Sequence, residues 1–479
     1  MGTAFGNAWS GARMALCAAS VLWLGLAGGC MSAARRDAAH WVMVETDNIQ
    51  LRTNVRRDHA VQIARDMQRT YDVLARFAMP CAARRAQDRV PVTVLPFREF
   101  STLAPNALGF YRAAQVTWLP GYDGQLVLPD GLGFESRRVF QHEVTHRLVT
   151  ACFVRVPSWL NEGLAGFFET MRVDAAGVTF GRPPYVIAPE GTVRRPGSLV
   201  VDGQPVRVVS FDMLPSLADL FAMRNLLAHD GTGATPAYAV AWALVHFLVL
   251  GAPDLTPRYE AFLAALRTPG RDARALFTQA FEDVPLQDRL NAYLRGGKFD
   301  VLQSQPSAVA PRADHVDARV RDLPEEDAYV HLAWLHAQAR DDAGQQRFRD
   351  YVEAAKEHPR TRTAAYLVAA IAAMARGDLA DAEREVQEGL AGTPDAARAA
   401  PPAFLEARVD ILLARRAPAA ELDGAAERLR RVATTAGQWC SLAQVALRRG
   451  DRKAALALSA RGLALDPRLV ICRMADAAE

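Results

Sequence analysis

The segment "VFQHEVTHRL", residues 139–148, contains two histidines four positions apart and a glutamate directly after the first of them. On an α-helix His142 and His146 lie one turn apart on the same face, so both imidazoles can converge on one metal ion. Glu143 then stands beside the ion, where a carboxylate can act on a bound water. The alternative is that both histidines line a helix surface or make ordinary hydrogen bonds in a core. The metal interpretation requires a third ligand, because catalytic zinc takes three protein ligands and keeps a fourth position for water.

A second segment, "WLNEGLAGFFE", offers that third ligand at Glu162, with fifteen residues between it and His146. This spacing allows one helix to end, turn and present a second helix to the first. The pair of motifs, HExxH followed by WLxEGxA, resembles the gluzincin metallopeptidases, the group that includes thermolysin and the aminopeptidase N family. The resemblance implies an α+β, thermolysin-like zincin domain that hydrolyses peptide bonds. It also implies that His142, His146 and Glu162 bind Zn²⁺ and that Glu143 is the general base and proton shuttle.

A later segment, "YAVAWALVHFLVLG", is similar to the helix that begins "YxKG" in the aminopeptidase N family. In that family the tyrosine donates a hydrogen bond to the oxyanion of the tetrahedral intermediate, and the resemblance places Tyr238 in this role. The alternative is a packing tyrosine with its hydroxyl at the surface. We interpret His246, eight residues further along the same helix, as a structural residue.

Three features depart from, or add to, the gluzincin pattern. Gly166 stands where relatives usually have a glutamate, one turn after the metal-binding glutamate. A carboxylate that orients a metal ligand is absent from that position, which puts activity in doubt more than metal binding, and Glu169 is the candidate to replace it in part. By the same resemblance, "GQLVLPD", residues 124–130, is the sheet edge along which a peptide substrate lies. No GxMEN-like segment indicates capture of a free substrate amine.

The composition bounds the class of protein. The chain has 479 residues and is 50% hydrophobic, which is enough for two or three globular domains, each with its own core. Its net charge is +3, from 56 basic and 53 acidic residues. Because the basic and acidic residues are nearly equal in number, the protein has no strong electrostatic field that would attract nucleic acid. We therefore expect no nucleic-acid partner.

The N-terminus has the pattern of an export signal. Arg13 precedes the uncharged run "MALCAASVLWLGLAGG", which is too short to span a bilayer and suits the core of a signal peptide. The run ends "LAGGC" at Cys30, which resembles the lipobox of bacterial lipoproteins and implies lipidation of Cys30 after removal of the preceding signal. Ala27 stands where the lipobox usually has leucine, so plain cleavage and an uncleaved anchor stay open. We therefore predict a membrane-anchored lipoprotein of the cell envelope, on its periplasmic or extracellular face.

Removal of the signal and lipidation of Cys30 leave four cysteines, two in each half of the chain. An exported protein reaches a compartment that permits disulfides. A Cys81 to Cys152 bridge and a Cys440 to Cys472 bridge are one interpretation, and buried unpaired thiols are the other.

The hydrophobic periodicity divides the chain into an α/β part and a helical part. Residues 41–103 predict a strand, a long amphipathic helix and a second strand, and short strands follow within residues 109–130. The two motif segments predict helices, with Ser136 and Ser158 as their N-caps. Residues 173–209 indicate hairpins or an irregular insertion, and helices resume from residue 214 to about residue 294.

A helical repeat region follows a predicted linker at residues 301–314, which is rich in Pro, Ala and Ser. The segments "AMARGDLADAEREVQEGLAGTP" and "ALRRGDRKAALALSARGLALDP" align without gaps, and a further unit closes at Pro359. With a degenerate unit near residues 403–436, the region resembles a tetratricopeptide array of about four helix pairs. The alternative is an unrelated helical bundle. We therefore predict a signal at residues 1–30, a peptidase-like domain at 41–300 and repeats at 315–479.

Three functions are consistent with these features. The first is a membrane-anchored zinc metallopeptidase that acts on a protein or peptide and whose repeats recruit a protein partner. The second is a catalytically weak or inactive envelope scaffold that acts through its repeats, which Gly166 favours. The third is a hydrolase of non-peptide amides or esters that uses the same zinc water.

Overall fold

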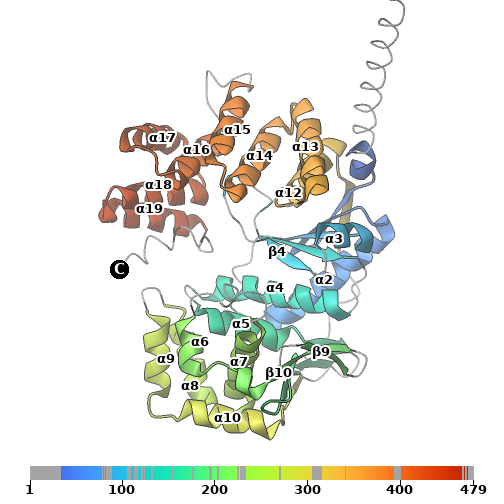
Figure 1. Ribbon diagram of the computed structural model, residues 1–479, viewed down its shortest axis with the longest axis vertical. Helices are drawn as coiled ribbons and strands as arrows, with labels where there is room; N and C mark the ends of the chain where they lie inside the picture. Colours follow the sequence, from blue (N-terminus) through green and yellow to red (C-terminus); the bar gives the residue numbers. More distant parts are fainter. Residues whose placement is uncertain are drawn as a thin grey trace, which may run out of the picture.

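The computed structural model shows a mixed α/β region below a helical C-terminal region (Figure 1). The structure describes residues 34–77, 79, 81, 89–104, 109–112, 117–119, 122, 124–130, 134–153, 156–174, 177–193, 197–201, 204–223, 226, 234–268, 271–304, 316–339, 341–392, 401–466, 469 and 472. The predicted signal peptide, Cys30 and most of the predicted linker lie outside these residues. Among the described residues, no helix has both the length and the apolar character needed to cross a membrane.

A six-stranded mixed sheet forms the centre of the α/β region, with the strand order β12-β1-β2-β3-β5-β4. The strands β2, β3 and β5 are mutually parallel, whereas β12, β1 and β4 pair antiparallel with their neighbours. The strands are β1 (Val42–Glu45), β2 (Ile49–Thr53), β3 (Val90–Leu95), β4 (Phe110–Arg112), β5 (Gln125–Pro129) and β12 (Arg319–Asp322).

Both faces of the sheet are buried at its centre, because alternate side chains of β1, β3 and β5 enter different hydrophobic cores. In β5, Leu126 and Leu128 join the core shared with helices α2 (Arg57–Phe77) and α4 (Phe134–Cys152), whereas Val127 joins the core shared with the C-terminal helices. Successive side chains of a strand point to opposite faces, so each apolar strand serves two cores. The sheet therefore holds α4 on one side and the helical region on the other.

Two local predictions were wrong. The segment that contains β5 is not the edge of the sheet, because β4 pairs with it through Phe110 and Val127 and occupies the edge itself. Neither serine caps its helix: Ser136 lies inside α4, and Ser158 is the first residue of α5 (Ser158–Phe168) after Pro157. The Ser158 hydroxyl instead accepts a hydrogen bond from the backbone N–H of Leu226 at 3.3 Å.

Two small sheets and a layer of helices complete the α/β region. Hairpins form where the sequence indicated them, since β6 pairs antiparallel with β7 and β9 with β10. The small strands are β6 (Arg172–Asp174), β7 (Gly177–Phe180), β8 (Tyr185–Ala188), β9 (Gly197–Val201), β10 (Gln204–Ser210) and β11 (Leu302–Ser304). The helices are α3 (Phe97–Leu103), η2 (Phe211–Met213), α6 (Leu217–Ala222), α7 (Ala234–His246), the π-helix η4 (Phe247–Gly251), α8 (Thr256–Ala265), α9 (Ala273–Phe281) and α10 (Leu286–Gly296).

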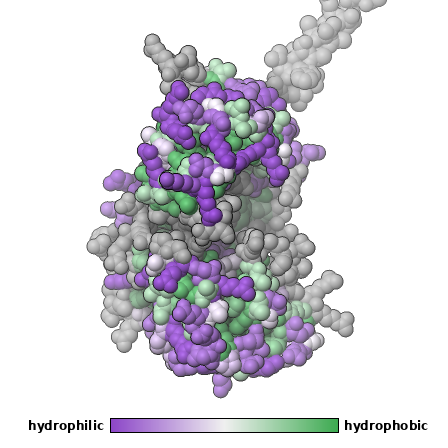
Figure 2. Space-filling view, turned by 90° about the vertical axis from the view of Figure 1, so that its left-hand side faces the viewer, coloured by the Kyte–Doolittle hydropathy of each residue, from purple (hydrophilic) through white to green (hydrophobic). Residues whose placement is uncertain are grey.

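The C-terminal region consists of helices that pack as consecutive pairs. They are α12 (Glu325–His336), α13 (Asp342–Glu357), α14 (Arg362–Arg376), α15 (Leu379–Ala391), α16 (Pro402–Ala414), α17 (Ala419–Val432), α18 (Ala436–Arg448) and α19 (Arg452–Leu465). On the face shown in Figure 2, hydrophilic side chains cover much of the helical region and of the α/β region below it, with smaller apolar patches between them.

The repeated "RGD" of two helix pairs has a local physical cause. Gly377 and Gly450 end α14 and follow α18 with φ of 80° and 76°, a left-handed conformation that glycine adopts without a steric penalty. The aspartates that follow, Asp378 and Asp451, cap the next helix by accepting a backbone N–H at 2.9 Å. The turn after α16 places Arg416 at φ 55° instead, which explains why that unit is degenerate in sequence.

The helical region packs directly on the sheet rather than apart from it. Strand β12, which follows the predicted linker, pairs with β1. The Nε1–H of Trp118 donates to Asp410 Oδ2 of α16 at 3.0 Å, and Thr117 donates to Glu406 of the same helix. The two predicted regions therefore share a buried core.

Both cysteine pairs are disulfide-bonded. Cys81 pairs with Cys152 at a Cα–Cα distance of 5.5 Å, and Cys440 pairs with Cys472 at 4.8 Å. The first bridge ties the segment after α2 to the last residue of α4. The bridged interpretation of these four cysteines is therefore the one that the structure has.

Candidate metal centre

Helix α4 presents its two histidines away from the sheet because its apolar residues recur on the other side. Phe140, Val144 and Leu148 are spaced every four residues, and each is only 1% exposed. A helix places such residues on one face. His142 and His146 are offset by about half a turn, on the side that meets α5.

The structure brings the three predicted ligands together. The Nε2 atoms of His142 and His146 lie 3.3 and 3.4 Å from Glu162 Oε2 of α5. One ligand atom from each of the three residues lies within 4.8 Å of the others, which is a spacing that can hold a metal ion. Glu162 is 8% exposed, so its carboxylate is held in place by the surrounding protein.

Two of these contacts have the separation expected between neighbouring ligands of one tetrahedral ion. Glu162 Oε2 is buried but makes no hydrogen bond of good geometry, although it faces two imidazole nitrogens. Bonds of about 2.0–2.2 Å at tetrahedral angles put neighbouring zinc ligands roughly 3.3–3.5 Å apart. The two nitrogen-to-oxygen distances fall at this separation, and a donor set of two imidazoles and one carboxylate suits zinc.

Glu169, the C-cap residue of α5, supplies the carboxylate that Gly166 lacks. Its Oε2 accepts a hydrogen bond from Nδ1–H of His142 at 2.8 Å. A proton held on Nδ1 leaves Nε2 as the nitrogen that would bind a metal ion. Arg138, one turn before His142 on α4, forms a buried ion pair with the other Glu169 oxygen.

The electrostatic field of these carboxylates favours positive charge at the centre. Burial opposes charge on His142, but the facing Glu162 carboxylate and the hydrogen-bonded Glu169 carboxylate raise its pKa to about 10. Burial likewise opposes charge on Glu162 and Glu169, yet the facing imidazoles, and Arg138 beside Glu169, hold the pKa of each carboxyl near 2. A field that stabilises an imidazolium here also stabilises a bound cation.

The glycines of α5 have a packing cause. A Cβ at Gly163 would lie 2.4 Å from the carbonyl oxygen of Ala241 on α7, so the two helices can cross this closely only at a glycine. A Cβ at Gly166 would meet the Trp242 side chain at 3.4 Å. The space that a glutamate would need at position 166 is therefore occupied by Trp242, which is fully buried.

Glu143 is mostly buried beside the ligands. Burial raises the pKa of its carboxyl, and the negative charges of Glu162 and Glu169 act in the same direction against the attraction of the two imidazoles. A carboxylate with a raised pKa is a better acceptor of a proton near neutral pH. Glu143 therefore carries a carboxyl of raised pKa next to the three candidate ligands.

Tyr238 lies near the start of α7, half-buried and under the influence of the same carboxylates. Burial and then the charge of Glu162 raise the pKa of its phenol well above its usual value, so the hydroxyl keeps its proton as a donor. His246, at the other end of α7, is fully buried. It contacts the Asp300 carbonyl at 3.0 Å and the Tyr293 hydroxyl at 2.8 Å, which agrees with a structural role.

Three residues near the centre were not predicted from sequence. Arg138 could have been found, because it precedes His142 by four residues on one helix. Tyr185 of β8 and Arg207 of β10 could not, because only strand pairing brings them together, with Arg207 Nη1 3.4 Å from the Tyr185 hydroxyl. Burial raises the pKa of Tyr185 to about 12, and the charge of Glu169 contributes.

The fold and the site define a mixed α/β protein with a helical C-terminal region and a three-residue group able to hold a metal ion. Residues 138–269 match the model of a protein family described as a protein of unknown function, DUF1570. The matched span contains all three members of the group. None of the curated proteins compared with the chain matches it.

Proposed function

We propose that this protein is a zinc metallopeptidase of the gluzincin kind, with a thermolysin-like zincin domain. The observation that carries the proposal is the convergence of His142 and His146 on Glu162, with contacts of 3.3 and 3.4 Å and with Glu143 directly beside them. His142, His146 and Glu162 would hold the zinc ion. When bound, zinc supplies a Lewis acid for the scissile carbonyl and lowers the pKa of an attacking water.

The protein's own residues supply the proton transfers. Glu143 takes a proton from the attacking water and delivers it to the leaving amine, which its partly buried position and raised pKa support. Tyr238 donates a hydrogen bond to the carbonyl oxygen as negative charge develops there. Glu169 orients His142, and Arg138 holds Glu169 in place.

The rest of the chain gives the proposed enzyme its location and partner. Lipidation at Cys30 would anchor it to the membrane at the periplasmic or extracellular face of the cell envelope. The helix pairs of residues 325–465, as a tetratricopeptide-like array, would recruit a protein substrate or partner. Their close packing on the central sheet supports a fixed placement relative to the metal centre.

A paired measurement tests the proposal. Purified protein should contain about one zinc per chain and should cleave an unstructured protein such as casein. Glu143→Gln should keep the zinc and lose roughly 10²–10⁴-fold in rate. The control is Glu260→Gln, an exposed carboxylate of α8 away from the ligands. Absence of stoichiometric zinc overturns the metal assignment. Zinc without turnover overturns the peptidase and favours the scaffold, whereas unchanged turnover in Glu143→Gln overturns the role of Glu143 as general base.

A further inference from the structure

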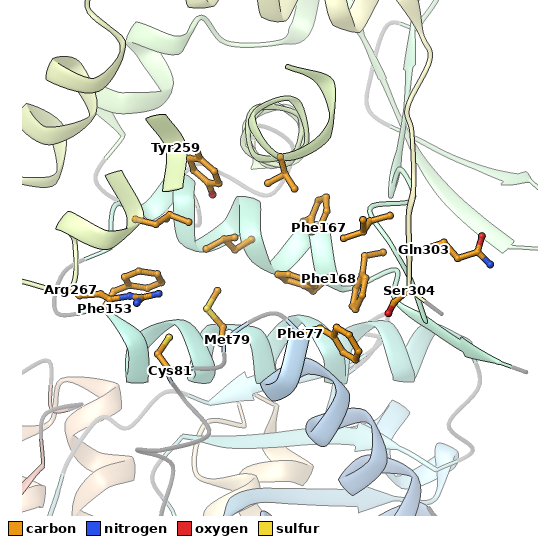
Figure 3. A pocket seen from close by; sticks show the side chains of 15 residues that line it. Phe77, Met79, Cys81, Phe153, Phe167, Phe168, Tyr259, Arg267, Gln303 and Ser304 are labelled. Carbon is orange, nitrogen blue, oxygen red and sulfur yellow. The ribbon is translucent and has the colours of Figure 1, made fainter. Parts of the chain in front are cut away.

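A second cavity lies apart from the candidate metal centre. It has a volume of about 420 Å³ and is bounded by α5, α8, the C-terminal end of α2 and strand β11 (Figure 3). None of its lining residues is a metal ligand candidate, Glu143 or Tyr238. Cavities of about 300–1,000 Å³ are the usual size of small-molecule sites.

The cavity wall is almost entirely apolar. Phe167 and Phe168 of α5 and Phe180 of β7 are at most 9% exposed, and their rings contact one another at centroid distances of 5.1 and 5.5 Å. The wall continues to Leu302 of β11, an apolar side chain that is 47% exposed. Such a surface binds hydrocarbon and offers few partners to a polar molecule.

The few polar side chains of the lining lie at separate places, with Arg267 and Ser304 at opposite ends. Arg267, the one charged residue of the lining, stands with Phe153 at one end of the cavity, whereas Phe77, Phe168 and Ser304 stand at the other (Figure 3). Its guanidinium lies 6.0 Å from the centre of the Phe153 ring. The side chain is exposed, and among the described residues no carboxylate lies within ion-pair distance of it.

A buried hydroxyl lies on α8, which ends two residues before Arg267. Tyr259 of α8 is 3% exposed, and its hydroxyl has no hydrogen-bond partner among the described residues. A buried hydroxyl without a partner costs about 1–3 kcal/mol, so a native structure rarely keeps one without a use. Figure 3 shows its ring reaching from α8 toward the cavity.

We propose that this cavity binds a long-chain fatty acid, with its carboxylate at Arg267 and its hydrocarbon chain along the phenylalanine wall toward Leu302. A planar guanidinium pairs with a carboxylate through two parallel hydrogen bonds, and that pairing fixes the orientation of the head. One cation at one end and an apolar wall beyond it match a molecule with a single charged head and a single chain. The buried Tyr259 hydroxyl is a second polar group in the lining of the same cavity.

Displacement of the fluorescent fatty acid cis-parinaric acid from the purified full chain by palmitate tests this assignment. One molecule of palmitate per chain is expected to bind, and hexadecanol, which has the same chain without the charge, should bind at least about tenfold more weakly. Arg267→Gln should remove that preference by weakening palmitate alone. Arg274→Gln, at an exposed arginine of the neighbouring helix α9, is the matched control and should leave palmitate binding unchanged.

A variant that fills the cavity separates chain binding from head binding. Leu263→Trp places a larger ring among the lining residues and should abolish binding of both palmitate and hexadecanol. Its thermal midpoint and zinc content report whether it is folded, and Val249→Phe, at another lining residue, is the second filling variant if it is not. The proposal is overturned if palmitate fails to bind saturably, if Arg267→Gln leaves the preference over hexadecanol intact, or if lysophosphatidylglycerol binds while palmitate does not.

Discussion

The carboxylate of Glu169 lies 2.8 Å from Nδ1 of His142, seven residues after the glutamate that faces the other nitrogen of the same ring. His142 is therefore held between two carboxylates, one on each side of its imidazole. This arrangement explains how the centre tolerates glycine at position 166. The orienting carboxylate comes from the C-cap of α5, where Arg138 of α4 can pair with it.

The first prediction concerns the contact between Glu169 and His142. Glu169→Gln keeps the size of the side chain and removes its charge, so zinc affinity should fall about 10–100-fold. Competition with a chromophoric chelator measures the affinity, and Glu260→Gln serves as the surface control. Because the change also removes the negative charge from the buried Arg138–Glu169 ion pair, the thermal midpoint should fall. Unchanged zinc affinity in folded Glu169→Gln would show that the contact does not act on the metal.

The second prediction compares the two glycines of α5. Gly163→Ala should cost roughly 1–3 kcal/mol of unfolding free energy, because its Cβ would meet a backbone carbonyl at 2.4 Å. Gly166→Ala brings its Cβ into ordinary contact with Trp242 at 3.4 Å, and helix propensity favours alanine by about 1 kcal/mol. Urea unfolding of both variants should therefore rank Gly166→Ala as the more stable. The reverse order would contradict the close crossing of α5 and α7.

The third prediction separates chemistry from metal binding at Tyr238. Tyr238→Phe removes only a hydroxyl, so zinc affinity should be unchanged while kcat for peptide cleavage falls by roughly 10²–10³-fold. An unchanged kcat would assign Tyr238 to packing. A parallel loss of zinc affinity would point to a structural role near Glu162.

The sequence allowed the ligands to be predicted because they lie on two helices that are adjacent in the chain. The spacing of His142 and His146 on one helix and the number of residues between His146 and Glu162 are local properties of the sequence. The structure brings the three side chains together as these spacings predict. Glu169 was only a partial candidate, because its contact depends on where α5 ends. Tyr185 and Arg207 meet through strand pairing over a long separation, which no local spacing encodes.

In the central sheet, too, the contacts between distant segments could not be predicted from the sequence. The run "VPVTVL" of β3 is buried on both faces, and a continuous apolar strand indicates as much without naming what covers it. The covering helices include α12 and α14, more than two hundred residues later. The resemblance to gluzincins placed β5 at the edge, and the three-residue strand β4 is too short for its sequence pattern to show that it pairs outside β5.

The fourth prediction concerns the disulfides. Peptide mapping under non-reducing conditions should find Cys81 with Cys152 and Cys440 with Cys472. Replacement of both Cys440 and Cys472 by serine should lower the unfolding free energy by about 2–5 kcal/mol. Free thiols at these four positions in the exported protein would contradict the bridges.

The last prediction is a pH dependence at the contact between the sheet and the helical region. Asp410 of α16 accepts a hydrogen bond from Trp118 at 3.0 Å, and burial raises the pKa of its carboxyl from 3.8 to about 6. A carboxyl whose pKa is higher in the folded state binds its proton more tightly there. Its stabilising contribution is therefore complete below pH 3.8 and is lost as the pH rises through about 6.

Asp410→Asn removes this dependence, because the amide keeps an acceptor for the Trp118 N–H and carries no charge. At pH 8 the variant should be more stable than the natural protein by roughly 2 kcal/mol, and the difference should vanish near pH 4. Thermal or urea unfolding at both pH values measures it, with Asp47→Asn, at an exposed aspartate between β1 and β2, as the control. If the natural protein and Asp410→Asn differ equally at both pH values, the Asp410 carboxyl does not titrate differently on folding. Such a result would mean that its contact with Trp118 stays hydrated, and that the helical region meets the sheet less tightly than the shared core indicates.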